Sequence, residues 1–173
     1  MRLSNRIFFE QVEALLTEGR EVQIRMRGHS MRPLLRDGRD TAVVAPLVRT
    51  AAQQPDTPRI GAGHPTPMPI VDMRPTLRRG DVVLFRCGDC HILHRIVHRC
   101  GDDFVLAGDG NYRITERCRT ADILARLERV VRPSGRTIEC RSLRWRLQSR
   151  LWLALPSGLR RFLLRATWHL GLR

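Results

Sequence analysis

Three β-rich runs, separated by two Gly-Asp pairs, constrain the fold of this chain more than any other feature of its sequence. The runs are DVVLFRC, CHILHRIVHR and DFVLAG, and the pairs are Gly88-Asp89 and Gly101-Asp102. Runs of apolar and β-branched residues bounded by such pairs are typical of strands joined by tight turns. The stretch from 81 to 108 therefore predicts an antiparallel meander.

The rest of the chain adds strands to this meander and places helices at both ends. Apolar residues recur at helical spacing over 3–18, whereas 22–26 and 40–46 have the character of short strands. A second hairpin is predicted over 124–140, with its turn at Pro-Ser-Gly, and only 141–173 is helical again. We therefore expect a mainly β, antiparallel core with flanking N- and C-terminal helices.

Composition divides the chain into a domain, an insert and a tail. Residues 47–76 contain six prolines, so we expect neither a strand ladder nor a helix there but a long surface excursion. Residues 1–140, with this insert, are predicted to form one domain. Residues 141–173 are predicted to form a basic amphipathic tail, divided into two helices by Pro156.

The charge balance limits both the partners and the chemistry. The net charge is +14 and every basic residue is Arg. Because guanidinium stays protonated, a general base must be His, a carboxylate or a thiolate. The excess of positive charge suits an anionic surface, either nucleic acid or phospholipid.

The cysteines and the N-terminal sequence bear on the compartment. Five cysteines is an odd number, and the short apolar run Ile7-Phe8-Phe9 is followed at once by Glu10. This start does not have the pattern of a secretory signal, and no stretch approaches the ~18 apolar residues of a spanning helix. We expect a cytoplasmic protein without a transmembrane helix, peripheral on the inner face of the membrane if its tail binds lipid.

Four short motifs carry the functional prediction. They are GHSMRP (28–33), GDVVLF (80–85), HRIV (94–97) and GDGN (108–111). In this order they resemble the serine peptidase superfamily of signal peptidases and LexA-like repressors, over roughly residues 22–131. Members of that superfamily use either a Ser-Lys or a Ser-His pair. Because the chain has no Lys, the resemblance implies the Ser-His branch of archaeal and endoplasmic-reticulum signal peptidases.

The resemblance implies a serine endopeptidase that forms an acyl-enzyme at Ser30 with His94 as general base. Its substrate would be an extended precursor peptide or protein, with small residues before the cut, and neither cofactor nor metal is expected. A hydroxyl needs a neighbouring base to become nucleophilic, and neutral imidazole serves at physiological pH. By position Asp109 matches the supporting acid, with Glu116 and Asp103 as weaker candidates, and the Ser30 N–H is the expected oxyanion donor.

Plainer interpretations remain for each of these residues. A serine or aspartate beside glycine is common in turns, and a strand histidine is often only packed. The run 87–100 also has zinc-type ligands, although strand alternation would place them on two faces: Cys87, Cys90, His94, His98 and Cys100.

Two alternatives concern the basic residues. A non-catalytic, Arg-rich module that binds nucleic acid is the alternative function, although only about twenty residues precede the serine motif and leave no room for a helix-turn-helix. Residues 141–173 combine Arg with Leu and Trp, which is the composition of a helix lying on anionic lipid. The same pattern equally suits packing of its apolar side on the β core.

Overall fold

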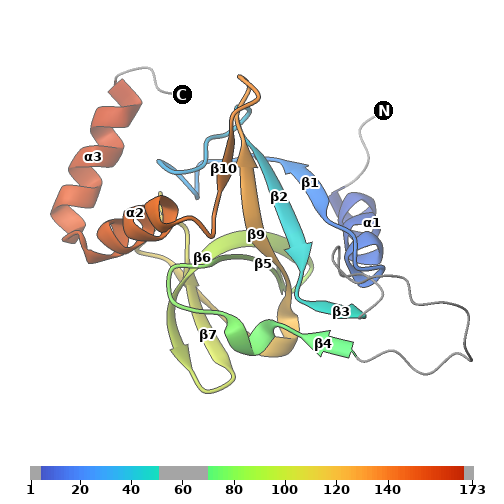
Figure 1. Cartoon of the computed structure of the whole chain (residues 1–173). Coiled ribbons are helices and arrows are strands. Elements are labelled where there is room, and N and C mark those ends of the chain that lie inside the picture. Colours follow the sequence, from blue (N-terminus) through green and yellow to red (C-terminus); the bar gives the residue numbers. More distant parts are fainter. Residues whose placement is uncertain (1–4, 51–69, 170–173) are drawn as a thin grey trace, which may run out of the picture.

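An eight-stranded antiparallel sheet forms the centre of the molecule in the computed structural model, which describes residues 5–50 and 70–169. Its order is β1-β2-β9-β5-β6-β7-β8, and β10 pairs with β9. The strands are β1 (Val22–Arg25), β2 (Thr41–Pro46), β5 (Val82–Cys87), β6 (Cys90–Cys100), β7 (Asp103–Ala107), β8 (Thr115–Arg119), β9 (Ile123–Val131) and β10 (Thr137–Glu139). The predicted fold class, mainly antiparallel β with terminal helices, is confirmed (Figure 1).

The predicted meander is present as β5-β6-β7. Its two turns place Gly88 at φ +56° and Gly101 at φ +60°, a region that glycine enters without steric cost. The meander continues into β8, which the sequence did not predict, because the polar run TERCR lacks the apolar character of the other strands. β8 pairs with β7 from Thr115 opposite Ala107 onwards.

The Pro-rich segment corrects one expectation. β3 (Val48–Thr50) and β4 (Ile70–Asp72) form a two-stranded antiparallel ladder, followed by the 3-10 turn η2 (Arg74–Thr76). The expectation that 47–76 holds no ladder is therefore wrong at both ends of the segment. Neither of these strands contains proline, so their N–H groups are available for pairing. Residues 51–69 lie outside the described part of the chain.

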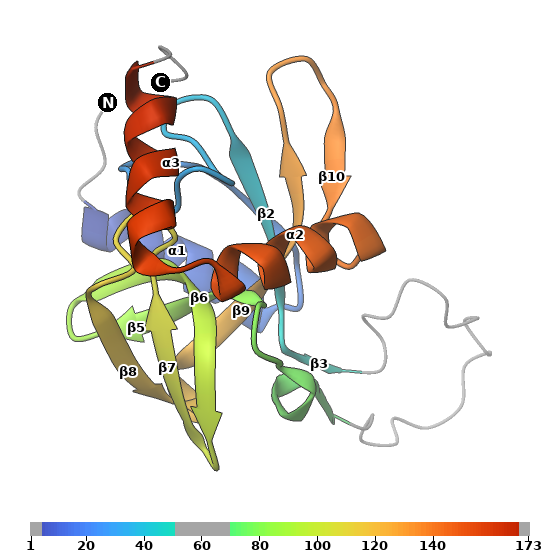
Figure 2. The same cartoon turned by 90° about the vertical axis from the view of Figure 1, so that its left-hand side faces the viewer.

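The helices lie on two sides of the sheet, as both views show (Figures 1 and 2). α1 (Asn5–Thr17) is on one side, and α2 (Leu143–Ala154) and α3 (Ser157–His169) are on the other. Pro156 separates α2 from α3, as the sequence predicted. No helix in the described ranges is long and apolar enough to cross a bilayer.

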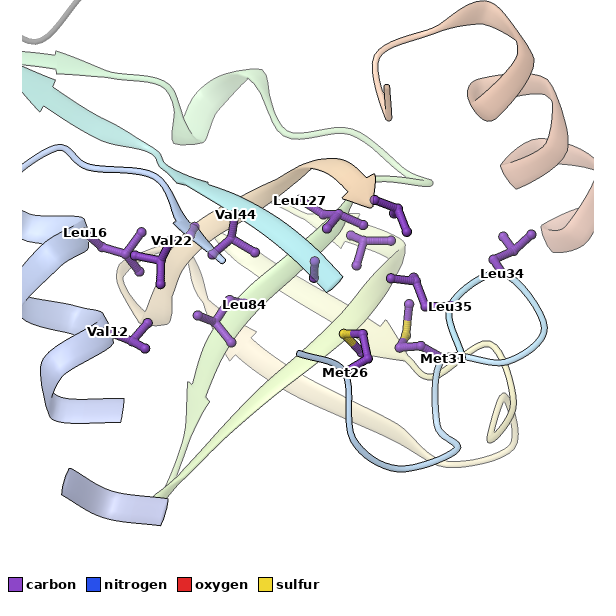
Figure 3. Packing of buried hydrophobic residues seen from close by; sticks show 14 of the residues in the cluster. Val12, Leu16, Val22, Met26, Met31, Leu34, Leu35, Val44, Leu84 and Leu127 are labelled. Atoms are coloured by element: carbon purple, nitrogen blue, oxygen red, sulfur yellow. The ribbon is translucent and has the colours of Figure 1, made fainter. Parts of the chain in front are cut away.

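The larger apolar cluster lies between α1, the sheet and the loop after β1. Val12 and Leu16 enter it from α1, and Met31 and Leu35 enter it from the loop (Figure 3). A second cluster lies within the curved β5–β8 half of the sheet, around Phe85 and Phe104. The loop that carries the serine motif thus packs directly against the hydrophobic core.

Candidate functional site

Ser30 lies in a loop that its apolar neighbours hold against the core. Met31, Leu34 and Leu35 are 1%, 6% and 1% exposed, whereas Ser30 itself is half-buried. The loop closes where the Met26 N–H donates to the Asp40 carbonyl over 2.9 Å. The spacing Ser-Met-x-x-Leu-Leu therefore buries the residues after Ser30 and leaves Ser30 at the boundary with solvent.

His94 lies in β6 and is 5% exposed. Its Nδ1 is 2.9 Å from Glu116 Oε2, on β8. Because a carboxylate only accepts hydrogen bonds, Nδ1 must carry the proton. In the uncharged form of the ring, this arrangement leaves the lone pair on Nε2, as a general base requires.

Gly108 brings the serine loop and the imidazole together. A Cβ placed on Gly108 would lie 2.5 Å from the Ser30 carbonyl oxygen and 3.0 Å from His94 Nε2. The neighbouring Gly110 N–H donates to the same Ser30 carbonyl over 2.7 Å. The GDGN turn is therefore hydrogen-bonded to the Ser30 carbonyl, and any side chain at Gly108 would collide with that carbonyl and crowd the His94 ring.

The Ser30 hydroxyl is not hydrogen-bonded to His94 within the described part of the chain. Contacts between nucleophile and base are often long without substrate and shorten when it binds. The Ser30 N–H also donates to no acceptor within residues 5–50 and 70–169. This N–H is therefore free to donate to an oxyanion beside Oγ.

Asp109 does not support the imidazole. Its two carboxylate oxygens accept from Arg95 Nε and Nη2, over 2.8 and 2.7 Å. The side chains of this ion pair are 0% and 2% exposed for Arg95 and Asp109. The expected placement of Asp109 next to His94 is corrected, because Glu116 holds that place and Asp109 is engaged by Arg95.

Arg95 connects the motifs that the sequence analysis singled out. Its Nη1 donates to the Gly80 carbonyl over 2.6 Å and to Ser149 Oγ over 2.8 Å. Gly80 opens the GDVV motif, Asp109 lies in the GDGN turn, and Ser149 is on α2. The buried Arg95 guanidinium thus links the start of the GDVV motif, the GDGN turn and α2 next to His94.

Sequence reasoning missed Arg95 and Ser149 as site residues. Arg95 follows His94 in β6, where an arginine would ordinarily point to solvent. One signal could have found it, since a buried acid needs a cation and Asp109 was already assigned to the site. Ser149 gave no such signal, because a serine in a helix is usually solvated.

The residues of the zinc alternative do not gather. Cys87 and Cys90 face each other across the β5–β6 turn, and a bulge between Ile96 and His98 interrupts the alternation of β6. His98 is exposed whereas His94 is buried. Among the described residues, no group of three or more His, Cys, Asp or Glu side chains is arranged to hold a metal ion.

A pocket of about 360 Å³ lies between the GDGN turn and α3. Gly110 and Arg113 line it from the turn, and Arg161 and Arg165 line it from α3. Gly110 also contacts the serine loop, so the pocket adjoins the candidate site. Tyr112 and Leu164 also line the pocket, and its wall is largely apolar.

Comparison with known proteins gives no relative for this chain. No protein-family model, no curated protein and no solved structure matches it.

Proposed function

We propose that this chain is a serine endopeptidase of the signal-peptidase type, with Ser30 as nucleophile and His94 as general base. One observation carries the proposal: a Cβ built on Gly108 would meet both the Ser30 carbonyl oxygen and His94 Nε2, at 2.5 and 3.0 Å, while Glu116 is hydrogen-bonded to Nδ1 of the same ring. The two residues are sixty-four positions apart in the sequence. Packing for stability alone does not require a histidine ring nitrogen and a serine backbone to converge on the same turn.

The chemistry follows from this arrangement. Ser30 Oγ attacks the carbonyl carbon of a peptide bond and transfers its proton to His94 Nε2. The oxyanion that forms accepts a hydrogen bond from the Ser30 N–H. When the C–N bond breaks, Nε2 returns its proton to the leaving amine, and an ester remains on Ser30. Water then attacks the ester with Nε2 again accepting a proton, and Ser30 recovers its own.

Glu116 has a positioning role in this scheme. Its carboxylate holds the ring orientation and stabilises the imidazolium that forms after proton transfer. Its side chain is 21% exposed, so it is partly screened by solvent. Asp109 acts indirectly, because it binds Arg95 and so holds the GDGN turn against the serine loop.

The proposal is tested by acylation of the full chain with a fluorophosphonate probe, together with cleavage of a mixed peptide library. Ser30→Ala should abolish labelling, and His94→Ala should slow it by at least about 100-fold. Two matched controls, Ser134→Ala in the exposed β9–β10 turn and His98→Ala on the exposed end of β6, should label like the wild type. Undiminished labelling of both site variants would exclude the proposal.

A further inference from the structure

The structure fixes which side of α2 faces the protein. Trp145, Ser149 and Trp152 are 5%, 2% and 6% exposed and recur at helical spacing. Trp145 belongs to the larger apolar cluster, and Ser149 Oγ accepts from Arg95. The tryptophan side of α2 therefore packs on the β core. This packing is one of the two roles that the sequence of residues 141–173 allowed.

The opposite side of α2 carries three exposed leucines. Leu143, Leu147 and Leu151 are 81%, 60% and 59% exposed. At about 100° per residue, a spacing of four places them in one stripe roughly 12 Å long. An exposed apolar stripe of this size costs free energy in water and is typical of an interaction surface.

Arginines flank the leucine stripe on both sides. Helical geometry puts Arg144 on one side and Arg146 and Arg150 on the other, and all three are exposed. Residues 141–173 contain eight arginines and no acidic residue. A stripe of leucine between guanidinium groups matches an anionic lipid surface, where acyl chains take the leucines and phosphates pair with the arginines.

We propose that α2 lies on an anionic bilayer surface through Leu143, Leu147 and Leu151, with Arg144, Arg146 and Arg150 at the headgroups. Nucleic acid is a weaker match, because a phosphate backbone offers nothing to three exposed leucines. The proposal does not depend on peptidase activity. It does place the Arg95-centred site one helix away from the membrane, since Ser149 lies on the buried side of the same helix.

The test is co-sedimentation of the full chain with vesicles of phosphatidylcholine alone or of phosphatidylcholine mixed with phosphatidylglycerol. The wild type should bind the mixed vesicles and bind pure phosphatidylcholine at least ten-fold more weakly. Leu143→Ser/Leu147→Ser/Leu151→Ser should reduce binding to the mixed vesicles by more than ten-fold. Because these side chains are exposed, the variant should keep the thermal unfolding midpoint of the wild type within a few degrees.

A second pair of variants separates a defined face from general attraction of a basic protein. Arg144→Gln/Arg146→Gln/Arg150→Gln removes three charges beside the stripe. Arg20→Gln/Arg117→Gln/Arg136→Gln removes three from exposed positions on other elements. The first should weaken vesicle binding about ten-fold and the second by less than three-fold.

Three results would overturn the proposal. Equal losses from the two arginine triples would show attraction by net charge alone. Vesicle binding that survives the leucine substitutions would show that the stripe does not enter the bilayer. A change of oligomeric state on leucine substitution, with vesicle binding intact, would assign the stripe to a second copy of the chain. Fluorophosphonate labelling of the same variants reports separately on the peptidase site.

Discussion

Asp109 binds Arg95 through both carboxylate oxygens, in a pair whose side chains are 2% and 0% exposed. The pair fastens the GDGN turn to β6, and the same turn donates from Gly110 to the Ser30 carbonyl. The acid that was expected to orient His94 instead holds the GDGN turn, whose backbone is hydrogen-bonded to the Ser30 carbonyl. This gives two acidic residues near the site, Asp109 and Glu116, with different consequences on substitution.

Breaking the Arg95–Asp109 pair should cost much of the stability of the fold. Asp109→Asn leaves a buried guanidinium without its counter-charge, which should lower the free energy of unfolding by about 3–5 kcal/mol. Arg95→Met/Asp109→Asn should cost less than the sum of the two single substitutions, because neither charge is then left alone. Urea unfolding measures all three variants. If the losses of stability in the two single variants added up to the loss in the double variant within about 0.5 kcal/mol, Arg95 and Asp109 would not be a coupled pair.

Glu116→Gln should affect activity rather than stability. The amide oxygen still accepts from His94 Nδ1, but the negative charge that stabilises the imidazolium is lost. The rate of probe acylation should fall at least about ten-fold. Asp103→Asn, at an exposed position on β7, is the matched control and should be acylated at the wild-type rate. A wild-type acylation rate in Glu116→Gln would argue against the positioning role.

Gly108→Ala should disable the site through steric overlap alone. The new methyl group would meet backbone, the Ser30 carbonyl oxygen at 2.5 Å, and would press on His94 Nε2 at 3.0 Å. We expect about 1–3 kcal/mol of destabilisation and loss of probe labelling. Gly158→Ala is the control, because a Cβ at that glycine meets nothing within 4 Å. Full labelling of Gly108→Ala would show that the two residues are not held together at this turn.

Glu128 gives the fold a defined pH dependence. Burial raises the pKa of its carboxyl, but hydrogen bonds and charge from Arg141 and Arg126 outweigh burial and leave the pKa below its ordinary 4.5. A carboxyl whose pKa is lower in the folded state than in the unfolded state stabilises the protein when the pH is above the unfolded-state pKa. This stabilisation is lost as the pH falls through the folded-state pKa. Arg141 is 62% exposed, so solvent screening limits this contribution.

Glu128→Gln should therefore destabilise the protein by about 1–2 kcal/mol at pH 7, with the difference shrinking below about pH 4. Chemical denaturation across this pH range provides the measurement. Glu18→Gln, at a position with a side chain 61% exposed, should change stability by less than about 0.5 kcal/mol throughout. If the stability difference between the wild type and Glu128→Gln grew on acidification, the pKa of Glu128 would have to be raised by folding rather than lowered.

The sequence by itself predicted most strands of the central sheet, the turns between them and the place of Ser30 in a loop. Period-two runs and Gly-Asp pairs act locally, so β5, β6 and β7 could be predicted from neighbours in the chain. The polar β8 could not, because its pairing with β7 depends on a partner strand rather than on its own residues. The ladder between β3 and β4 was missed for the same reason, since the prolines between them dominated the local pattern.

Only the tertiary structure decided which acidic residue contacts His94 and which contacts Arg95. Asp109 and Glu116 are seven positions apart and equally able to pair with an imidazole. Glu116 contacts His94 because β8 folds beside β7, while Asp109 is claimed by an arginine that needs a buried counter-charge. The two sides of α2 were likewise divided by the core, which took the tryptophans and left the leucines exposed. The local sequence shows which polar and apolar side chains are present, but long-range packing decides which of them contact one another.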